Sequence, residues 1–190
     1  MPIRALAVAS LLLAPSLYGT DTAAIAPDTS VLEFLGFRAG ARLDELALHL
    51  RGLGDSKLRC RRSRVDARVS ECRAALHQPR LGGPVELWVS AMDSLAGVIM
   101  LSGVVAPGQL EQWRQALEGR YGRVGTRSQG TQSTLQWVRR GRMIRLTWRL
   151  ERGEKVASVS LVDGHVLDGW GRSAAVRSSS SAAQPLSRTR

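Results

Sequence analysis

Hydrophobic and polar residues alternate most regularly between Ser133 and Val162. If Arg140-Gly141 and Arg152-Gly153 are two-residue turns, three consecutive strands bring a series of apolar pairs together on one face, as a half-buried antiparallel sheet requires. The expected facing pairs are Leu135–Leu146, Trp137–Ile144, Leu146–Val159, Trp148–Ala157 and Ile144–Leu161. A shift by one residue would turn arginines into the core, so the pattern predicts one register. Another tight turn is expected at Asp163-Gly164.

Helical spacing appears twice. Arg42–Leu53 carries apolar residues on one side, and Gly54 is expected to end that helix. Pro107 can open a second helix, which Gly122 would stop. The apolar positions of the two helices are Leu43, Leu46, Ala47, Leu50 and Leu53, then Leu110, Trp113, Leu117 and Tyr121.

Shorter segments predict further strands before the second helix. Val31–Phe37 is apolar and expected to be extended, although Ser30-x-x-Glu33 could instead be the capping box of a helix. Val85–Ser90 and Ala96–Val105 are strand-like and joined near Met92-Asp93-Ser94, and a loop, 77–84, precedes them.

The N-terminus has the pattern of a secretory signal peptide. A short basic start is followed by the apolar stretch Ala5–Gly19, and small residues follow at Thr22-Ala23-Ala24. Residues 1–24 are therefore predicted to be removed, with an uncleaved membrane anchor as the alternative that the short, Pro15-interrupted stretch disfavours. The mature chain is expected to be extracytoplasmic, periplasmic or secreted, with no transmembrane span.

Two cysteines fit that compartment. Cys60 and Cys72 are the only cysteines, and an even count in an exported chain indicates one disulfide. In a hairpin that turns near Val65-Asp66-Ala67, the facing pairs are Arg61 with Glu71, Leu58 with Ala74 and Arg59 with Arg73. The first pair is favourable, and the last is a conflict of like charges. Closing so short a loop contributes about 3 kcal/mol in the chain-entropy account.

A shift of 67 residues places the first half of the chain on the second. Gly36, Leu43 and Leu50 then fall on Gly103, Leu110 and Leu117. Each half reads as strand, bend, helix and antiparallel strands. We therefore expect one domain, 25–170, with tandem halves 31–102 and 103–170 as one interpretation and chance amphipathic similarity as the other. The serine- and arginine-rich tail 171–190 is predicted to be disordered.

The segment Phe34–Leu50 (FLGFRAGARLDELALHL) resembles the opening of the SmpA/OmlA-type small envelope proteins and of the related β-lactamase-inhibitor-protein-like fold. Those families place a Gly-x-(Ser/Thr) start before a short helix that antiparallel strands follow. The resemblance implies a small extracytoplasmic binding module without a catalytic site. The lipid-anchoring cysteine of the SmpA/OmlA proteins is absent, and Ala41-Arg42 replaces the small polar residue before the helix, so no functional residue is carried over.

The charge balance is strongly basic. The sequence has 27 Lys+Arg against 16 Asp+Glu, a net charge of +11, and only Lys57 and Lys155 are lysines. Codon bias in a GC-rich genome explains an arginine excess, but arginines at alternate strand positions also share a face and can hold phosphate or carboxylate. The candidate sets are Arg59, Arg61 and Arg73, and Arg145 and Arg149. Nucleic acid is a poor partner because export removes the chain from it.

Little else indicates chemistry. His49, His77 and His165 have no partner at metal-ligand spacing, and no nucleophile elbow, His-Glu-x-x-His or phosphate-binding Gly-Lys motif occurs. No metal, cofactor or catalytic residue is predicted. Trp88 falls opposite Val85, Leu87 and Val89, which makes it the best candidate for an exposed aromatic anchor.

Together these patterns predict an α+β domain, with an antiparallel sheet and two helices on one face. The leading hypothesis is an exported, non-enzymatic interaction module of the bacterial envelope or secreted fraction, whose partner, a protein or an anionic envelope polymer, the sequence does not identify. The alternative is a binder of lipopolysaccharide phosphate or acidic polysaccharide through the arginine-rich faces, with Arg59, Arg61, Arg73, Arg145 and Arg149. A hydrolase with a site of dispersed residues is the third hypothesis.

Overall fold

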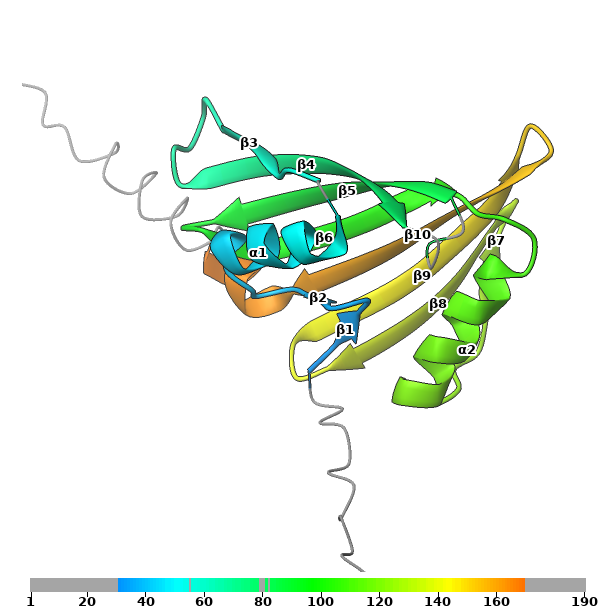
Figure 1. Cartoon of the computed structure of the whole chain (residues 1–190). Helices are drawn as coiled ribbons and strands as arrows, with labels where there is room; N and C mark the ends of the chain where they lie inside the picture. The colour runs from blue at the N-terminus through cyan, green and yellow to red at the C-terminus, as the bar shows by residue number, and fades with distance from the viewer. Residues whose placement is uncertain (1–30, 55, 79–80, 82, 170–190) are drawn as a thin grey trace, which may run out of the picture.

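A computed structural model describes residues 31–54, 56–78, 81 and 83–169 of the chain. Its main strands are β3 (Arg59–Arg62), β4 (Val69–Gln78), β5 (Gly83–Met92), β6 (Leu95–Val104), β7 (Arg127–Gln129), β8 (Gln132–Arg139), β9 (Arg142–Glu151) and β10 (Glu154–Asp163). They form one antiparallel sheet of eight strands in the order β3-β4-β5-β6-β10-β9-β8-β7 (Figure 1). Contact between β6 and β10 in the middle makes the sheet continuous.

The predicted α+β class is wrong. Strands make up 51% of the structure and helices 23%, so the protein is mostly β. Besides α1 (Leu43–Leu53) and α2 (Gln109–Tyr121), the described residues contain a short helical segment at 164–169 and a small sheet of β1 (Glu33–Phe34) and β2 (Phe37–Arg38). The prediction gave too much weight to two conspicuous helical patterns. Tight hairpins link longer strands through most of the remaining chain.

The predicted meander is confirmed. Residues Leu135 and Trp137 of β8 face Leu146 and Ile144, and all three expected pairs between β9 and β10 have the predicted register. The turns also match, because Arg140 and Arg152 have φ of 47° and 51° and each precedes a glycine that has a positive φ. Positive φ at both central residues is the geometry of the turns whose twist suits antiparallel hairpins.

Two local predictions are wrong, and the loop expected at 77–84 is shorter, because β4 extends through Gln78 and β5 begins at Gly83. Val31–Phe37 is not one strand, because Leu35 and Gly36 have φ of 52° and 82° and turn the chain between β1 and β2. The second is the tight turn at Asp163-Gly164. Instead, Asp163 ends β10, and its Oδ1 accepts hydrogen bonds from the backbone N–H groups of His165 (2.9 Å) and Val166 (3.3 Å). These are the bonds of a helix N-cap, and they start the segment 164–169.

The core lies against one face of the sheet. Along β5, Val85, Leu87 and Val89 are buried while Glu86 is exposed and Trp88 is half-buried, which is the alternation of a sheet covered on one side. Both helices contribute to this core and end where glycines were expected, at Gly54 and Gly122. The helix residues in the core cluster are Leu46 and Leu50 from α1, and Trp113, Leu117 and Tyr121 from α2.

Both edges of the large sheet are short and polar. β3 has the sequence RCRR, and every one of its residues is exposed. At the other edge, the three residues of β7, RSQ, are exposed as well. Short, charged edge strands are poor templates for pairing with a further strand.

The two halves of the sheet have the same order of elements. A helix precedes four strands in each, as α1 precedes β3–β6 and α2 precedes β7–β10. Leu50 and Leu117, which the shift of 67 residues relates, are both buried in their helices, whereas Gly36 lies in a turn and Gly103 in β6. Duplication of an ancestral half stays a prediction.

The predicted signal peptide 1–24 and tail 171–190 lie outside the described residues. Within the part of the chain that the structure describes, no helix has both the length and the apolar character needed to cross a membrane.

Candidate functional site

The sheet face opposite the core, called here the open face, carries all six predicted binding residues. Directly opposed residues of antiparallel strands share a face, so the register places them. One row of facing positions crosses seven of the strands and contains Arg59, Arg73, Trp88, Met100, Ser160, Arg145 and Gln136. Arg61 lies in the adjacent row of the same face, and Arg149 lies two rows away on the other side.

A depression of about 1020 Å³ lies on the open face, between β3–β6 and the connection that follows α1. Its lining includes Arg59, Arg73, Trp88 and Met100 of the row, together with Glu71 and Glu86. Trp88 and Met100 are half-buried. The structure therefore brings three of the predicted residues together beside an apolar floor.

Four charged side chains in this depression have no ion-pair or side-chain hydrogen-bond partner among the described residues. Arg59 and Arg73 face each other across β3 and β4, and both are exposed. Neither guanidinium makes an ion pair or side-chain hydrogen bond with another residue in the described ranges, and the same holds for Glu71 and Glu86. The like-charge conflict expected from the sequence is thus present in the fold.

Arg145 and Arg149 do not belong to this depression. Four strand spacings, about 19 Å, separate Arg145 from Arg73 across the sheet. Arg145 donates to Gln136 Oε1 from Nε (3.2 Å) and Nη2 (3.0 Å), and Arg149 forms an ion pair with Glu151 at 2.8 Å. The two predicted arginine sets therefore share a face without sharing a site.

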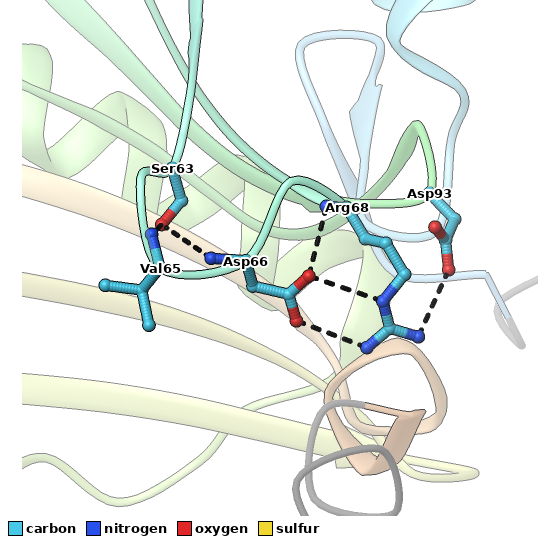
Figure 2. Close-up of polar contacts among 5 residues, drawn as sticks. All are labelled: Ser63, Val65, Asp66, Arg68 and Asp93. Atoms are coloured by element: carbon cyan, nitrogen blue, oxygen red, sulfur yellow. Dashed lines mark hydrogen bonds and ion pairs between the residues drawn. The ribbon is translucent and has the colours of Figure 1, made fainter. Parts of the chain in front are cut away.

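The predicted Cys60–Cys72 disulfide is confirmed, and Cys72 is buried in the core. Beyond it, the loop between β3 and β4 is fixed by polar contacts (Figure 2). Arg68 donates from Nε (3.4 Å) and Nη2 (3.3 Å) to the carboxylate of Asp66, and its Nη1 lies 3.9 Å from Asp93 in the next turn. The hydrogen bond to Asp66 raises the pKa of Arg68 above its ordinary value.

Sequence reasoning predicted this turn but missed its polar contacts, and it missed two more polar centres. Asp163 is 2% exposed and forms an ion pair with Nε of Arg142 at 2.7 Å. The Tyr121 hydroxyl donates to the backbone carbonyl of Glu33 (2.8 Å) and accepts from the backbone N–H of the same residue (2.7 Å). Burial raises the pKa of Tyr121 above its ordinary value. Only the Asp66-x-Arg68 spacing gave a local signal, because the other contacts join distant segments.

Two of the histidines have structural contacts. His49 Nε2 lies 2.9 Å from the carbonyl oxygen of Leu35, and His165 Nε2 lies 3.1 Å from that of Arg140. Each ring therefore holds the turn residue that precedes a glycine. His77 is exposed and lines the depression. Across the described ranges, no group of three or more His, Cys, Asp or Glu residues is arranged to hold a metal ion.

Comparison with known proteins adds no relative to this picture. No protein-family model matches the chain, and no curated protein or solved structure matches it. The resemblance of Phe34–Leu50 to the SmpA/OmlA-type proteins stays a prediction, and the depression has to be interpreted from its own residues.

Proposed function

We propose that the chain is an exported, non-enzymatic interaction module and that its open face is the binding surface. One observation carries this proposal. Trp88, Met100 and the arginines of the row lie on the face that α1 and α2 leave uncovered. Aromatic residues, methionine and arginine are enriched at protein interfaces, and depressions beside them are typical binding sites.

Two features support export. The disulfide fits an oxidising compartment outside the cytoplasm. The sequence of residues 1–24 has the basic start, apolar stretch and small residues of a secretory signal. Finding the purified native protein with both cysteines reduced in the cytosol would contradict this part of the proposal.

Affinity capture from envelope extract tests the binding surface. The wild-type protein is compared with Trp88→Ala and Met100→Ala, and with Leu48→Ala as the control. Leu48 is an exposed leucine of α1 (64% exposed), so that variant removes apolar surface away from the open face. We expect a partner that wild type and Leu48→Ala retain equally and that the two open-face variants lose. Equal retention by all four proteins would contradict the proposal.

A binder of anionic envelope material is the second candidate. The observation that favours it is the group of Arg59, Arg61 and Arg73, whose guanidinium groups have no ion-pair partner among the described residues. Binding to lipopolysaccharide phosphate or an acidic polysaccharide should weaken steeply between low and moderate ionic strength. Retention on anionic resin that does not change with salt would reject this candidate. The hydrolase hypothesis stays a prediction.

A further inference from the structure

The facing pair Arg59 and Arg73 is an unneutralised pair of like charges. Residues at such positions have Cβ atoms about 4.5–5.5 Å apart, and facing like charges destabilise a sheet. Because neither guanidinium forms an ion pair with a described residue, the fold keeps a local repulsion that a bound anion would relieve. Arginine forks bind carboxylate through two parallel hydrogen bonds, so a carboxylate between these residues can be held from both sides.

An apolar surface lies one strand away. Trp88 faces Arg73 across β4 and β5, and Met100 faces Trp88 across β5 and β6. Neighbouring strands are about 4.8 Å apart, so the indole lies beside the arginine pair at a distance that a carboxylate attached directly to a ring can span. Trp88 is half-buried and lines the depression, so part of the indole is available to a ligand there.

The carboxylates in the depression narrow the ligand class. Glu71 lies two residues from Arg73 on β4, and Glu86 lies two residues from Trp88 on β5. Both line the depression, and neither has a partner in the part of the chain that is described. These side chains repel a bare anion but accept hydrogen bonds from hydroxyl groups. A matching ligand therefore carries donors as well as a negative charge.

We propose that Arg59, Arg73, Trp88 and Glu86 bind a uronic-acid unit of an acidic polysaccharide. The ligand carboxylate lies between the two guanidinium groups, the ring packs on the indole and the hydroxyl groups donate to the glutamates. This inference rests on the proposed function, because it assumes that the open face is the binding surface. An acidic peptide would satisfy the arginines but supplies fewer donors for Glu71 and Glu86.

Calorimetric titration with oligogalacturonate tests the inference, using full-length protein with the disulfide intact. Arg59→Ala and Arg73→Ala should each weaken binding about tenfold, since each removes charge-assisted hydrogen bonds. Arg62→Ala is the matched control, because Arg62 is an exposed arginine of the same strand on the opposite face. Its binding should stay within about twofold of wild type.

Two more variants separate geometry from charge and folding. Arg73→Lys keeps the charge but loses the bidentate fork, so we expect a clear loss of affinity in a protein that folds normally. Trp88→Phe keeps an aromatic surface and should bind more tightly than Trp88→Ala. The methyl ester of oligogalacturonate, which lacks the negative charge, should bind at least about tenfold more weakly than the acid.

Apart from a failure of oligogalacturonate to bind, three results would overturn the inference. They are equal binding by Arg73→Ala and Arg62→Ala, equal binding of the ester and the acid, and tighter binding of polyglutamate than of oligogalacturonate. The last result would identify an acidic peptide as the ligand. If oligogalacturonate fails but Trp88→Ala still loses a captured partner, the saccharide inference falls alone. If the captured partner ignores Trp88→Ala and Met100→Ala, the proposed function falls as well.

Discussion

Replacing Asp163 by alanine removes the polar centre that joins the end of β10 to the start of β9. The carboxylate accepts a charge-assisted bond from Arg142 Nε at 2.7 Å and caps the segment 164–169 through the N–H groups of His165 and Val166. It is 2% exposed, so these contacts stand in place of hydration of the carboxylate. The variant leaves one guanidinium and two backbone donors without their acceptor.

The magnitude follows from these contacts. Loss of an N-cap costs about 1 kcal/mol. Removing one partner of a fully buried ion pair costs about 3–5 kcal/mol, but the Arg142 side chain is 35% exposed and regains water, so about 1–2 kcal/mol is expected here. Asp163→Ala should therefore lower the free energy of unfolding by about 2–3 kcal/mol. Asp163→Asn keeps the capping acceptor and should lose about 1–2 kcal/mol.

Urea unfolding, followed by tryptophan fluorescence, measures both variants. The midpoint should fall while the dependence of the free energy on urea concentration stays constant, because the surface exposed on unfolding is unchanged. A loss below about 0.5 kcal/mol for Asp163→Ala, the range of ordinary surface substitutions, would refute the assignment. Equal losses for Asp163→Ala and Asp163→Asn would show that the cap contributes nothing.

Three further predictions concern the turns, Tyr121 and the disulfide. Gly36→Ala and Gly141→Ala should unfold at lower temperature than Gly153→Ala. All three glycines have positive φ, but an added methyl group meets a histidine ring, that of His49 or His165, only at the first two. Equal decreases in unfolding temperature would contradict this. Because burial raises the pKa of Tyr121, its hydroxyl ionises at lower pH in the unfolded chain than in the folded protein. The contribution of the neutral hydroxyl to the free energy of unfolding is therefore complete below pH 10.0, the ordinary pKa, and is lost as pH rises through the folded pKa. In denaturant unfolding at alkaline pH, Tyr121→Phe should abolish this part of the fall in the free energy of unfolding. An unchanged fall would be inconsistent with the role of Tyr121. Reducing the disulfide should lower the free energy of unfolding by about 3 kcal/mol, measured against Cys60→Ser, which reductant should not affect.

The sequence predicted the parts of the fold that local chemistry specifies. The Arg140-Gly141 and Arg152-Gly153 turns set the register of β8–β10, because a shift by one residue would bury arginines. The pairing of Cys60 with Cys72 followed from the even cysteine count of an exported chain, and setting the two residues opposite each other in a hairpin also placed Arg59 opposite Arg73. The paired residues of a hairpin are close in the sequence, so the local pattern of apolar and turn residues is enough to predict their register.

Long-range contacts could not be predicted in this way. Nothing in a local pattern shows that β6 pairs with β10, which brings Trp88 and Met100 into one row with Arg145. For the same reason, the candidate arginines were assigned to a face but not to one depression, and the pair of Arg142 with Asp163 was missed. The fold class was wrong because helical periodicity is conspicuous in a sequence and the total length of strand is not.

The arginine-containing edge strands of the sheet limit how another molecule can bind. With only RCRR at one margin and RSQ at the other, an incoming strand finds few free backbone groups in a row and meets positive charge at the first of them. Growth of the sheet by lateral addition is therefore opposed. A partner that binds stably is therefore expected to contact the face of the sheet, across several strands, and not to pair along an edge strand.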